Sequence, residues 1–219
     1  MGTLAVGRLA GWAAFVLFLT VLAYVPRLTG EEPTKDVAYR WESSVIAVIQ
    51  VGIFVGVVLL LILGLDRRSF LGLGRPRSWW RAAGIAALIV IATLVVSAAV
   101  APFGNPEQEQ GLVPEHWDSS RAAQFAAFAV AVTVLAPIAE ELLFRGVGYG
   151  LLEPFGRGFA VVVVGLAFGL IHGLVAGFPV IATFGIGLAY LRARTGSIYP
   201  CMILHGAFNA LALAIGVTG

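Results

Sequence analysis

Two adjacent glutamates and an arginine lie inside an otherwise apolar stretch, where ionisable side chains are unexpected. Residues 136–146 read Ala-Pro-Ile-Ala-Glu-Glu-Leu-Leu-Phe-Arg-Gly and contain Glu140, Glu141 and Arg145. Each ionisable side chain at the centre of a membrane helix costs about 2.5–3.5 kcal/mol. Glu141 and Arg145 are four residues apart and can form an ion pair, which could also serve only to lock helices together. Glu140 is rotated by about 100° from Glu141, so it must face a polar group from another element, and it is the stronger functional candidate.

Pro137 precedes Glu140 by three residues. A proline inside a helix lacks the N–H that would bond the carbonyl of Thr133, and it tends to kink the helix. A kink at this point would make room for water and for a substrate backbone. The alternative is a tolerated proline without a role, because membrane helices accommodate proline.

His172 is the next ionisable group along the chain that is set among apolar residues. Phe168 lies four residues before it, on the same helical face. Gly165, Gly169 and Gly173 repeat at every fourth position, and such spacing lets two helices approach closely. The sequence therefore predicts that His172 is held against a neighbouring helix, either as a functional group or as a buried hydrogen-bonding residue.

His205 and Asn209 form a second pair with a spacing of four residues. Both can donate hydrogen bonds in one direction, or they can be a polar helix-packing pair. Counted at about 1.5 Å per residue from the nearest inner turns, Glu140 and His172 lie roughly 20 Å up, and His205 and Asn209 roughly 15–21 Å. Polar groups from three helices thus lie at about the same depth in the membrane, which predicts a single site.

The composition indicates which kind of protein positions these groups. Of 219 residues, 59% are hydrophobic and 12% are charged, whereas an ordinary soluble domain has roughly 25% charged residues. The mean hydropathy is +0.94. A soluble globular domain and a disordered chain are both excluded. The net charge of +2 does not suggest a nucleic-acid partner, and the lone Cys201 provides neither a disulfide nor a cysteine zinc site.

The sequence predicts an all-α, polytopic bundle of about seven transmembrane helices. We expect three N-terminal helices with their loops in residues 1–121 and a catalytic core of four helices in residues 122–219. The first helix is expected to be a span and not a signal peptide, because its apolar run is long and no small-x-small cleavage site follows it. The composition does not set an oligomeric state. The predicted spans are residues 4–24, 43–65, 82–101, 122–152, 157–173, 177–191 and 197–216.

The loop charges predict a multi-pass protein of the cell membrane with a cytoplasmic N-terminus, because cytoplasmic loops are enriched in Lys and Arg. With that orientation the inner segments carry nine basic and two acidic residues, and the outer segments carry four basic and eight acidic residues. The inner ones are Arg8, Asp66, Arg67, Arg68, Arg75, Arg77, Arg81, Glu153, Arg157, Arg192 and Arg194. The outer ones are Arg27, Glu31, Glu32, Lys35, Asp36, Arg40, Glu42, Glu107, Glu109, Glu115, Asp118 and Arg121.

These three motifs, taken together, resemble those of the CPBP family. Its members are intramembrane proteases related to the CAAX prenyl endopeptidases and to Abi-like bacteriocin-processing and immunity proteins. The motifs are Glu140-Glu141-x-x-x-Arg145, Phe168-x-x-x-His172 and His205-x-x-x-Asn209. They cover residues 136–209 in the order that the family has, with no departure. The resemblance does not extend to the first three spans beyond their hydrophobicity.

The resemblance implies an endopeptidase that cleaves a membrane-associated protein or peptide, by one of two mechanisms. In the first, Glu140 and His172 activate a water, His205 and Asn209 stabilise the oxyanion, and Glu141 with Arg145 orients the pocket. In the second, Glu140, His172 and His205 hold a zinc ion with an open position for water. We favour the first, because the zinc signature H-E-x-x-H is absent.

Two other functions are compatible with buried charges in a helical bundle. A proton-coupled transporter uses such residues as a relay, but we find neither the internal repeats nor the paired broken helices that transporters often show. A non-catalytic bacteriocin-immunity or scaffold membrane protein of the same fold predicts eroded motifs, and here the motifs are intact. Nothing in the sequence identifies a prenyl-binding feature or the substrate itself.

Overall fold

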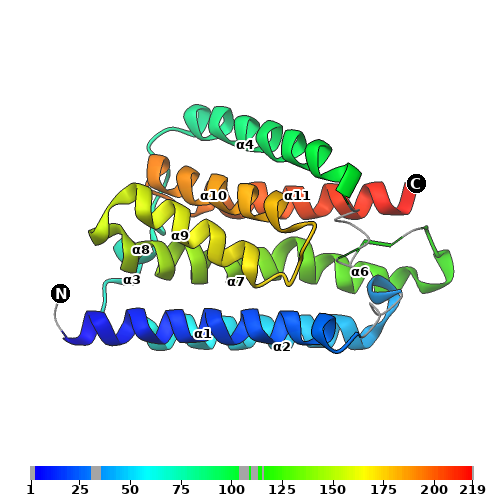
Figure 1. The fold of residues 1–219 in the computed structure, drawn as a ribbon, viewed down its shortest axis with the longest axis horizontal. Helices are drawn as coiled ribbons and strands as arrows, with labels where there is room; N and C mark the ends of the chain where they lie inside the picture. The colour runs from blue at the N-terminus through cyan, green and yellow to red at the C-terminus, as the bar shows by residue number, and fades with distance from the viewer. Residues whose placement is uncertain (1–2, 31–35, 104–108, 110–112, 115, 219) are drawn as a thin grey trace.

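The computed structural model describes residues 3–30, 36–103, 109, 113–114 and 116–218. Over these residues the fold is entirely helical, as predicted. Figure 1 shows the main helices side by side along the long axis of the molecule, with α1 and α2 on one side and α4 on the other. The segments that carry the three motifs lie between these two sides, so the bundle encloses them.

The three N-terminal helices face outward with apolar side chains. They are α1 (Thr3–Leu28), α2 (Trp41–Leu61) and α4 (Trp79–Val100). Their most apolar windows have mean hydropathies of 2.0, 2.8 and 2.6, and only 11–17% of each window is buried inside the protein. Helices that are apolar on all faces are stable in a lipid environment. The short helix α3 (Arg67–Leu71) begins at Asp66, whose carboxylate accepts a hydrogen bond from the Arg68 amide.

A continuous helical rod of 37 residues, Ser119–Phe155, carries the paired glutamates. Between a 3-10 turn at each end, it consists of α6 (Ala122–Val130), a π-helical segment (Ala131–Leu135), α7 (Ala136–Glu141), a second π-helical segment (Leu142–Gly148) and α8 (Tyr149–Leu152). At about 1.5 Å per residue the rod is longer than the roughly 30 Å hydrocarbon core of a bilayer. The prediction that this helix is too long for a simple span agrees with its length.

The remaining helices are α9 (Arg157–Leu170), α10 (Phe178–Thr195) and α11 (Tyr199–Thr218). The predicted close helix contact is present, because a side chain at Gly165 or Gly169 would meet the backbone of α10. Gly173 does not continue this stripe. It lies beyond the end of α9, in a turn with φ of 64°, beside the backbone of α1. Short 3-10 turns occupy Val37–Tyr39, Ala101–Phe103, Ser119–Arg121 and Glu153–Phe155.

The predicted number of seven membrane spans is only partly supported by the lengths of the helices. Within the described residues, five helices are long and apolar enough to cross a membrane. The other two expected spans exist as helices, but α9 has 14 residues and covers only about 21 Å. α10 has 18 residues; it begins one residue inside the predicted 177–191 range and ends four residues beyond it. The protein is therefore a multi-pass helical membrane protein whose count of seven is not confirmed.

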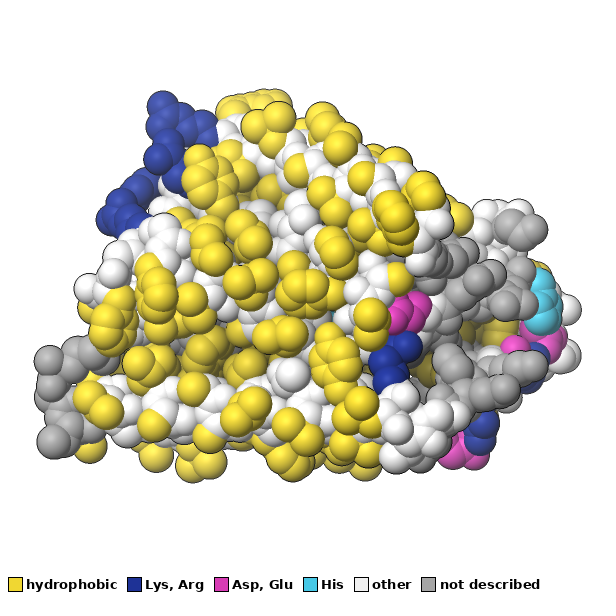
Figure 2. All heavy atoms as spheres, in the orientation of Figure 1, with side chains coloured by type: hydrophobic (Ala, Val, Ile, Leu, Met, Phe, Trp, Pro, Cys, Tyr) yellow, Lys and Arg dark blue, Asp and Glu magenta, His cyan; other side chains and the backbone are white. Residues whose placement is uncertain are grey.

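Charged side chains concentrate at the two ends of the bundle. Figure 2 shows hydrophobic side chains over the middle of the visible face, basic side chains alone at one end, and acidic and basic side chains together toward the other. The two ends are separated along the helix axes, as expected for loops on opposite sides of a membrane. Of the charges expected on the outer side, Glu31, Glu32, Lys35, Glu107 and Glu115 lie outside the described residues.

Candidate active site

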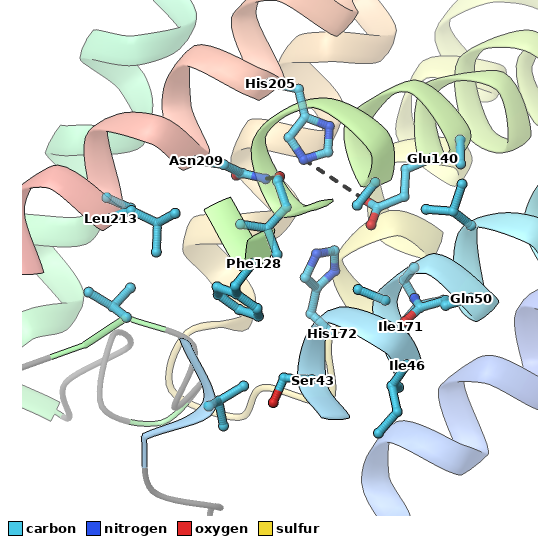
Figure 3. A pocket seen from close by; sticks show the side chains of 18 of the residues that line it. Ser43, Ile46, Gln50, Phe128, Glu140, Ile171, His172, His205, Asn209 and Leu213 are labelled. Atoms are coloured by element: carbon cyan, nitrogen blue, oxygen red, sulfur yellow. Dashed lines mark hydrogen bonds and ion pairs between the residues drawn. The ribbon is translucent and has the colours of Figure 1, made fainter. Parts of the chain in front are cut away.

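A single cavity of about 690 Å³ is lined by four of the six predicted catalytic residues. Glu140, His172, His205 and Asn209 all line it, together with Phe168 (Figure 3). The volume is in the range of roughly 300–1,000 Å³ that is typical of ligand pockets. Three segments that are distant in sequence therefore meet at this cavity, as their similar depths, predicted from the helix rise, indicated.

The paired glutamates have different environments because they leave α7 in different directions. Glu140 faces the cavity, where its side chain is 13% exposed. Glu141 faces the protein interior and is 0% exposed. Both lie in a six-residue α-helical segment between two π-helical segments. Wide turns of this kind are frequent at functional sites, and nothing in the local sequence pattern predicted them.

Glu141 and Arg145 form the predicted ion pair, fully buried behind the cavity. Arg145 Nη1 donates to Glu141 Oε1 at 3.0 Å, and both side chains are 0% exposed. Arg145 Nη2 donates to the carbonyl of Gly185 at 2.9 Å. The guanidinium also lies 4.3 Å from the centre of the Phe168 ring, a cation–π arrangement. The pair thus connects the rod to α10 and to the end of α9.

His205 lies between the two carboxylates. Its Nδ1 is 2.9 Å from Glu141 Oε1, within hydrogen-bonding distance, and its Nε2 is 3.8 Å from Glu140 Oε2. The second distance is too long for a direct hydrogen bond. The imidazole is fixed by Glu141 and presents its other nitrogen to the cavity. The contact with Glu141 could not be predicted from sequence, because it joins α7 to α11.

His172 is also fixed through Nδ1. It lies in the turn after α9, because the helix ends at Leu170 and not at residue 173 as predicted. Its Nδ1 is 2.7 Å from the carbonyl of Phe168. A carbonyl only accepts hydrogen bonds, so Nδ1 carries the hydrogen and Nε2 is left with a lone pair in the neutral ring. That nitrogen can accept a proton from a water. The Phe168 ring packs against the imidazole, with 4.7 Å between ring centres.

Asn209 is connected to the irregular stretch before Pro137. Its Nδ2 donates to the carbonyl of Val132 at 2.8 Å. Val132 is five residues before Pro137, and five residues is the spacing of the π-helical bonds in this segment, as in the bond from Ala136 to Ala131. Pro137 has no N–H to donate, so the Val132 carbonyl accepts a hydrogen bond from Asn209 instead. The carbonyl expected to lack its backbone donor was that of Thr133, one residue later. The second N–H of the amide can serve a ligand.

One wall of the cavity comes from α2, which the predicted site did not include. Ser43, Ala47, Gln50 and Phe54 line it. The lining also includes Val37, Arg40 and Glu42, near the N-terminal end of α2. The cavity therefore extends toward that end of the bundle, away from the arginine-rich segment between α2 and α4. The sequence signal for this wall was Gln50, a polar residue among the apolar residues of α2.

The turn that carries His172 is attached to α1 and to Glu109. Arg27 donates through Nε to the carbonyl of Gly173 and pairs with Glu109 at 3.3 Å. The carboxylate of Glu109 accepts hydrogen bonds from the amides of Val175 at 2.6 Å and Gly177 at 2.8 Å. This clasp, formed by Arg27 and Glu109, restrains the segment directly after His172. Sequence reasoning placed both residues only as outer loop charges.

Among the described residues, no three or more His, Cys, Asp or Glu side chains are placed so that they could hold a metal ion. Glu140, His172 and His205, the zinc set expected as an alternative, all line the cavity but do not form such a group in this structure.

In a comparison with known protein families, residues 122–211 match the family described as Type II CAAX prenyl endopeptidase Rce1-like. The match runs from the start of α6 past Asn209 and includes all three motifs, and it does not extend over α1, α2 and α4. No curated protein and no solved structure matches the chain. The predicted resemblance to the CPBP and CAAX proteases is confirmed for this segment.

Proposed function

We propose that this chain, whose residues 122–211 match the Rce1-like CAAX proteases, is an intramembrane endopeptidase that uses a water activated by Glu140 and His172. One observation carries the proposal. Glu140, His172, His205 and Asn209 line one cavity, and each imidazole is held by a partner on its far nitrogen. Fixed bases around a cavity are what hydrolysis by general base catalysis requires.

Glu140 and His172 are the groups available to take a proton from water. Glu140 Oε2 has no hydrogen-bond partner among the described residues, although it is buried. A buried polar atom without a partner costs free energy unless a water or a ligand satisfies it. A water between this oxygen and His172 Nε2 would satisfy both groups and would be poised to attack a carbonyl. General base catalysis of this type contributes roughly 10²–10⁴-fold in rate.

Asn209 and His205 are placed to stabilise the negative charge that forms on the attacked carbonyl oxygen. Asn209 has one N–H that is not used in its bond to Val132. His205 can donate through Nε2 when both ring nitrogens carry hydrogen, since Nδ1 faces Glu141. Buried Glu141 and Arg145 keep this ring in position. Donors that are already oriented cost no reorganisation when the charge develops.

The orientation of the cavity favours substrates that approach from outside the cytoplasm. The arginine-rich end, with Arg67, Arg68 and Arg75, is cytoplasmic by the positive-inside rule, as is the N-terminus in the cell membrane. The cavity extends toward the opposite end, where Val37 and Ser43 line it. A membrane-associated protein or peptide with an extracytoplasmic segment is therefore the proposed substrate class.

The test uses purified protein in liposomes and a library of quenched fluorogenic peptides. Wild type is expected to cleave members of the library, and Glu140→Gln is expected to lose that cleavage while remaining folded. Glu153→Gln is the matched control, because Glu153 is on the same rod and pairs with Arg157 at the surface. Cleavage by Glu140→Gln at the wild-type rate, or loss of cleavage in both variants, would contradict the mechanism.

A further inference from the structure

A polar side chain on α2 faces the cavity without a partner. Ser43, Ala47, Gln50 and Phe54 follow at spacings of four, three and four residues, which places them on one face of the helix. After Ser44, Gln50 is the only side chain of α2 that carries a hydrogen-bonding group. At about 1.5 Å per residue it lies roughly 6 Å along the helix axis from Phe54 and roughly 10 Å from Ser43.

A glutamine at this position is unfavourable in free energy unless its amide is hydrogen-bonded. The helix has a mean hydropathy of 2.8, and an amide in an apolar environment is unfavourable unless it is hydrogen-bonded. Among the described residues, none forms a hydrogen bond with the Gln50 side chain, which is exposed. It therefore makes no hydrogen bond to another described helix. A molecule inside the cavity, which Gln50 lines, can satisfy the amide.

We propose that Gln50 is a substrate-binding residue that hydrogen-bonds the peptide backbone beside the scissile bond. A glutamine side chain presents one acceptor and two donors, so it can pair with both the N–H and the C=O of an extended peptide. Figure 3 shows Gln50 on α2, on the opposite side of the pocket from Asn209. The substrate backbone then runs between α2 and α11, above Glu140. This role rests on the proposed endopeptidase function and extends the binding site beyond the segment that matches the protease family.

A backbone contact has a consequence that a packing contact does not have. It makes cleavage depend on one particular amide of the substrate and not on its side chain. Replacing that amide by an ester removes the N–H donor and leaves the chain length unchanged. The binding role therefore predicts that the effects of the ester and of a change at Gln50 are not additive.

The experiment measures kcat/KM with a quenched fluorogenic peptide that wild type cleaves and Glu140→Gln does not. Gln50→Met keeps the length of the side chain but removes the amide, and it is expected to lower kcat/KM about 10- to 100-fold, as expected for one or two hydrogen bonds. Val48→Leu is the control, because Val48 is 53% exposed and does not line the cavity. It should leave kcat/KM unchanged, and both variants should keep the wild-type melting temperature.

A series of ester-containing versions of the same peptide completes the test. One ester next to the scissile bond should lower kcat/KM in wild type about 10-fold and have little further effect in Gln50→Met. Equal ester effects in both proteins, or unchanged kcat/KM in Gln50→Met, would overturn the role of Gln50 and leave the endopeptidase function intact. A wild-type protein that cleaves no peptide of the library would overturn both.

Discussion

Removing Glu141 alone should destabilise the protein more than removing Glu141 and Arg145 together. Glu141→Leu leaves the Arg145 guanidinium buried, with the Gly185 carbonyl and the face of Phe168 as its remaining contacts. Breaking a buried ion pair by removing one partner costs about 3–5 kcal/mol, because a charge stays behind without compensation. With both partners replaced by apolar side chains, that charge is absent.

The size of the effect follows from the complete burial of the pair. In Glu141→Leu/Arg145→Met the cost that remains is the unpaired Gly185 carbonyl and the lost contact with His205, about 1–3 kcal/mol for each orphaned group. The coupling energy between the two positions should therefore be about 3 kcal/mol. The surface pair of Glu153 and Arg157 has the same i,i+4 spacing but is 43% and 70% exposed. Its coupling energy should be only about 0.3–0.5 kcal/mol.

The assay is reversible unfolding in mixed micelles, followed by tryptophan fluorescence, for the two single variants and the double variant at each pair of positions. The free energies of unfolding form two double-mutant cycles. A coupling energy at Glu141 and Arg145 as small as that of the surface pair would refute the reasoning. It would mean that water reaches the guanidinium in the folded protein.

Three further predictions concern the site. Asn209→Ala should lower kcat about 10²–10³-fold with little change in KM, as expected for loss of an oxyanion donor; a loss confined to KM would contradict this role. Glu109→Ala should speed amide hydrogen exchange at Val175 and Gly177 and lower kcat several-fold, because it opens the clasp beside the catalytic turn. Unchanged exchange at both amides would disprove the restraint. Chelation by 1,10-phenanthroline should leave peptide cleavage unaffected, whereas loss of activity that zinc restores would show a metal mechanism.

The sequence was sufficient to predict the helical membrane fold and the convergence of Glu140, His172, His205 and Asn209. Both follow from simple quantities, the apolar length of each segment and the rise per residue of a helix. The pairing of Glu141 with Arg145 also follows from helical spacing. These features are local, or they depend only on the depth of a residue along its helix.

The features that were not predicted depend on how the helices pack. The π-helical segments on each side of α7 change the register of the rod, and no local propensity encodes that change. The contact between His205 and Glu141 and the wall from α2 require the rotation of each helix about its own axis. The span count of seven is not confirmed, because α9, although apolar, is only 14 residues long.

The most direct test of the central claim is a comparison of membrane-associated peptides from cells that produce wild type or Glu140→Gln. Mass spectrometry with labelled new termini would identify each cleaved bond and its side of the membrane. The account predicts extracytoplasmic cleavage products that are present with wild type and absent with Glu140→Gln. Identical sets of termini in the two samples would contradict the assignment of Glu140 as the base of a peptidase.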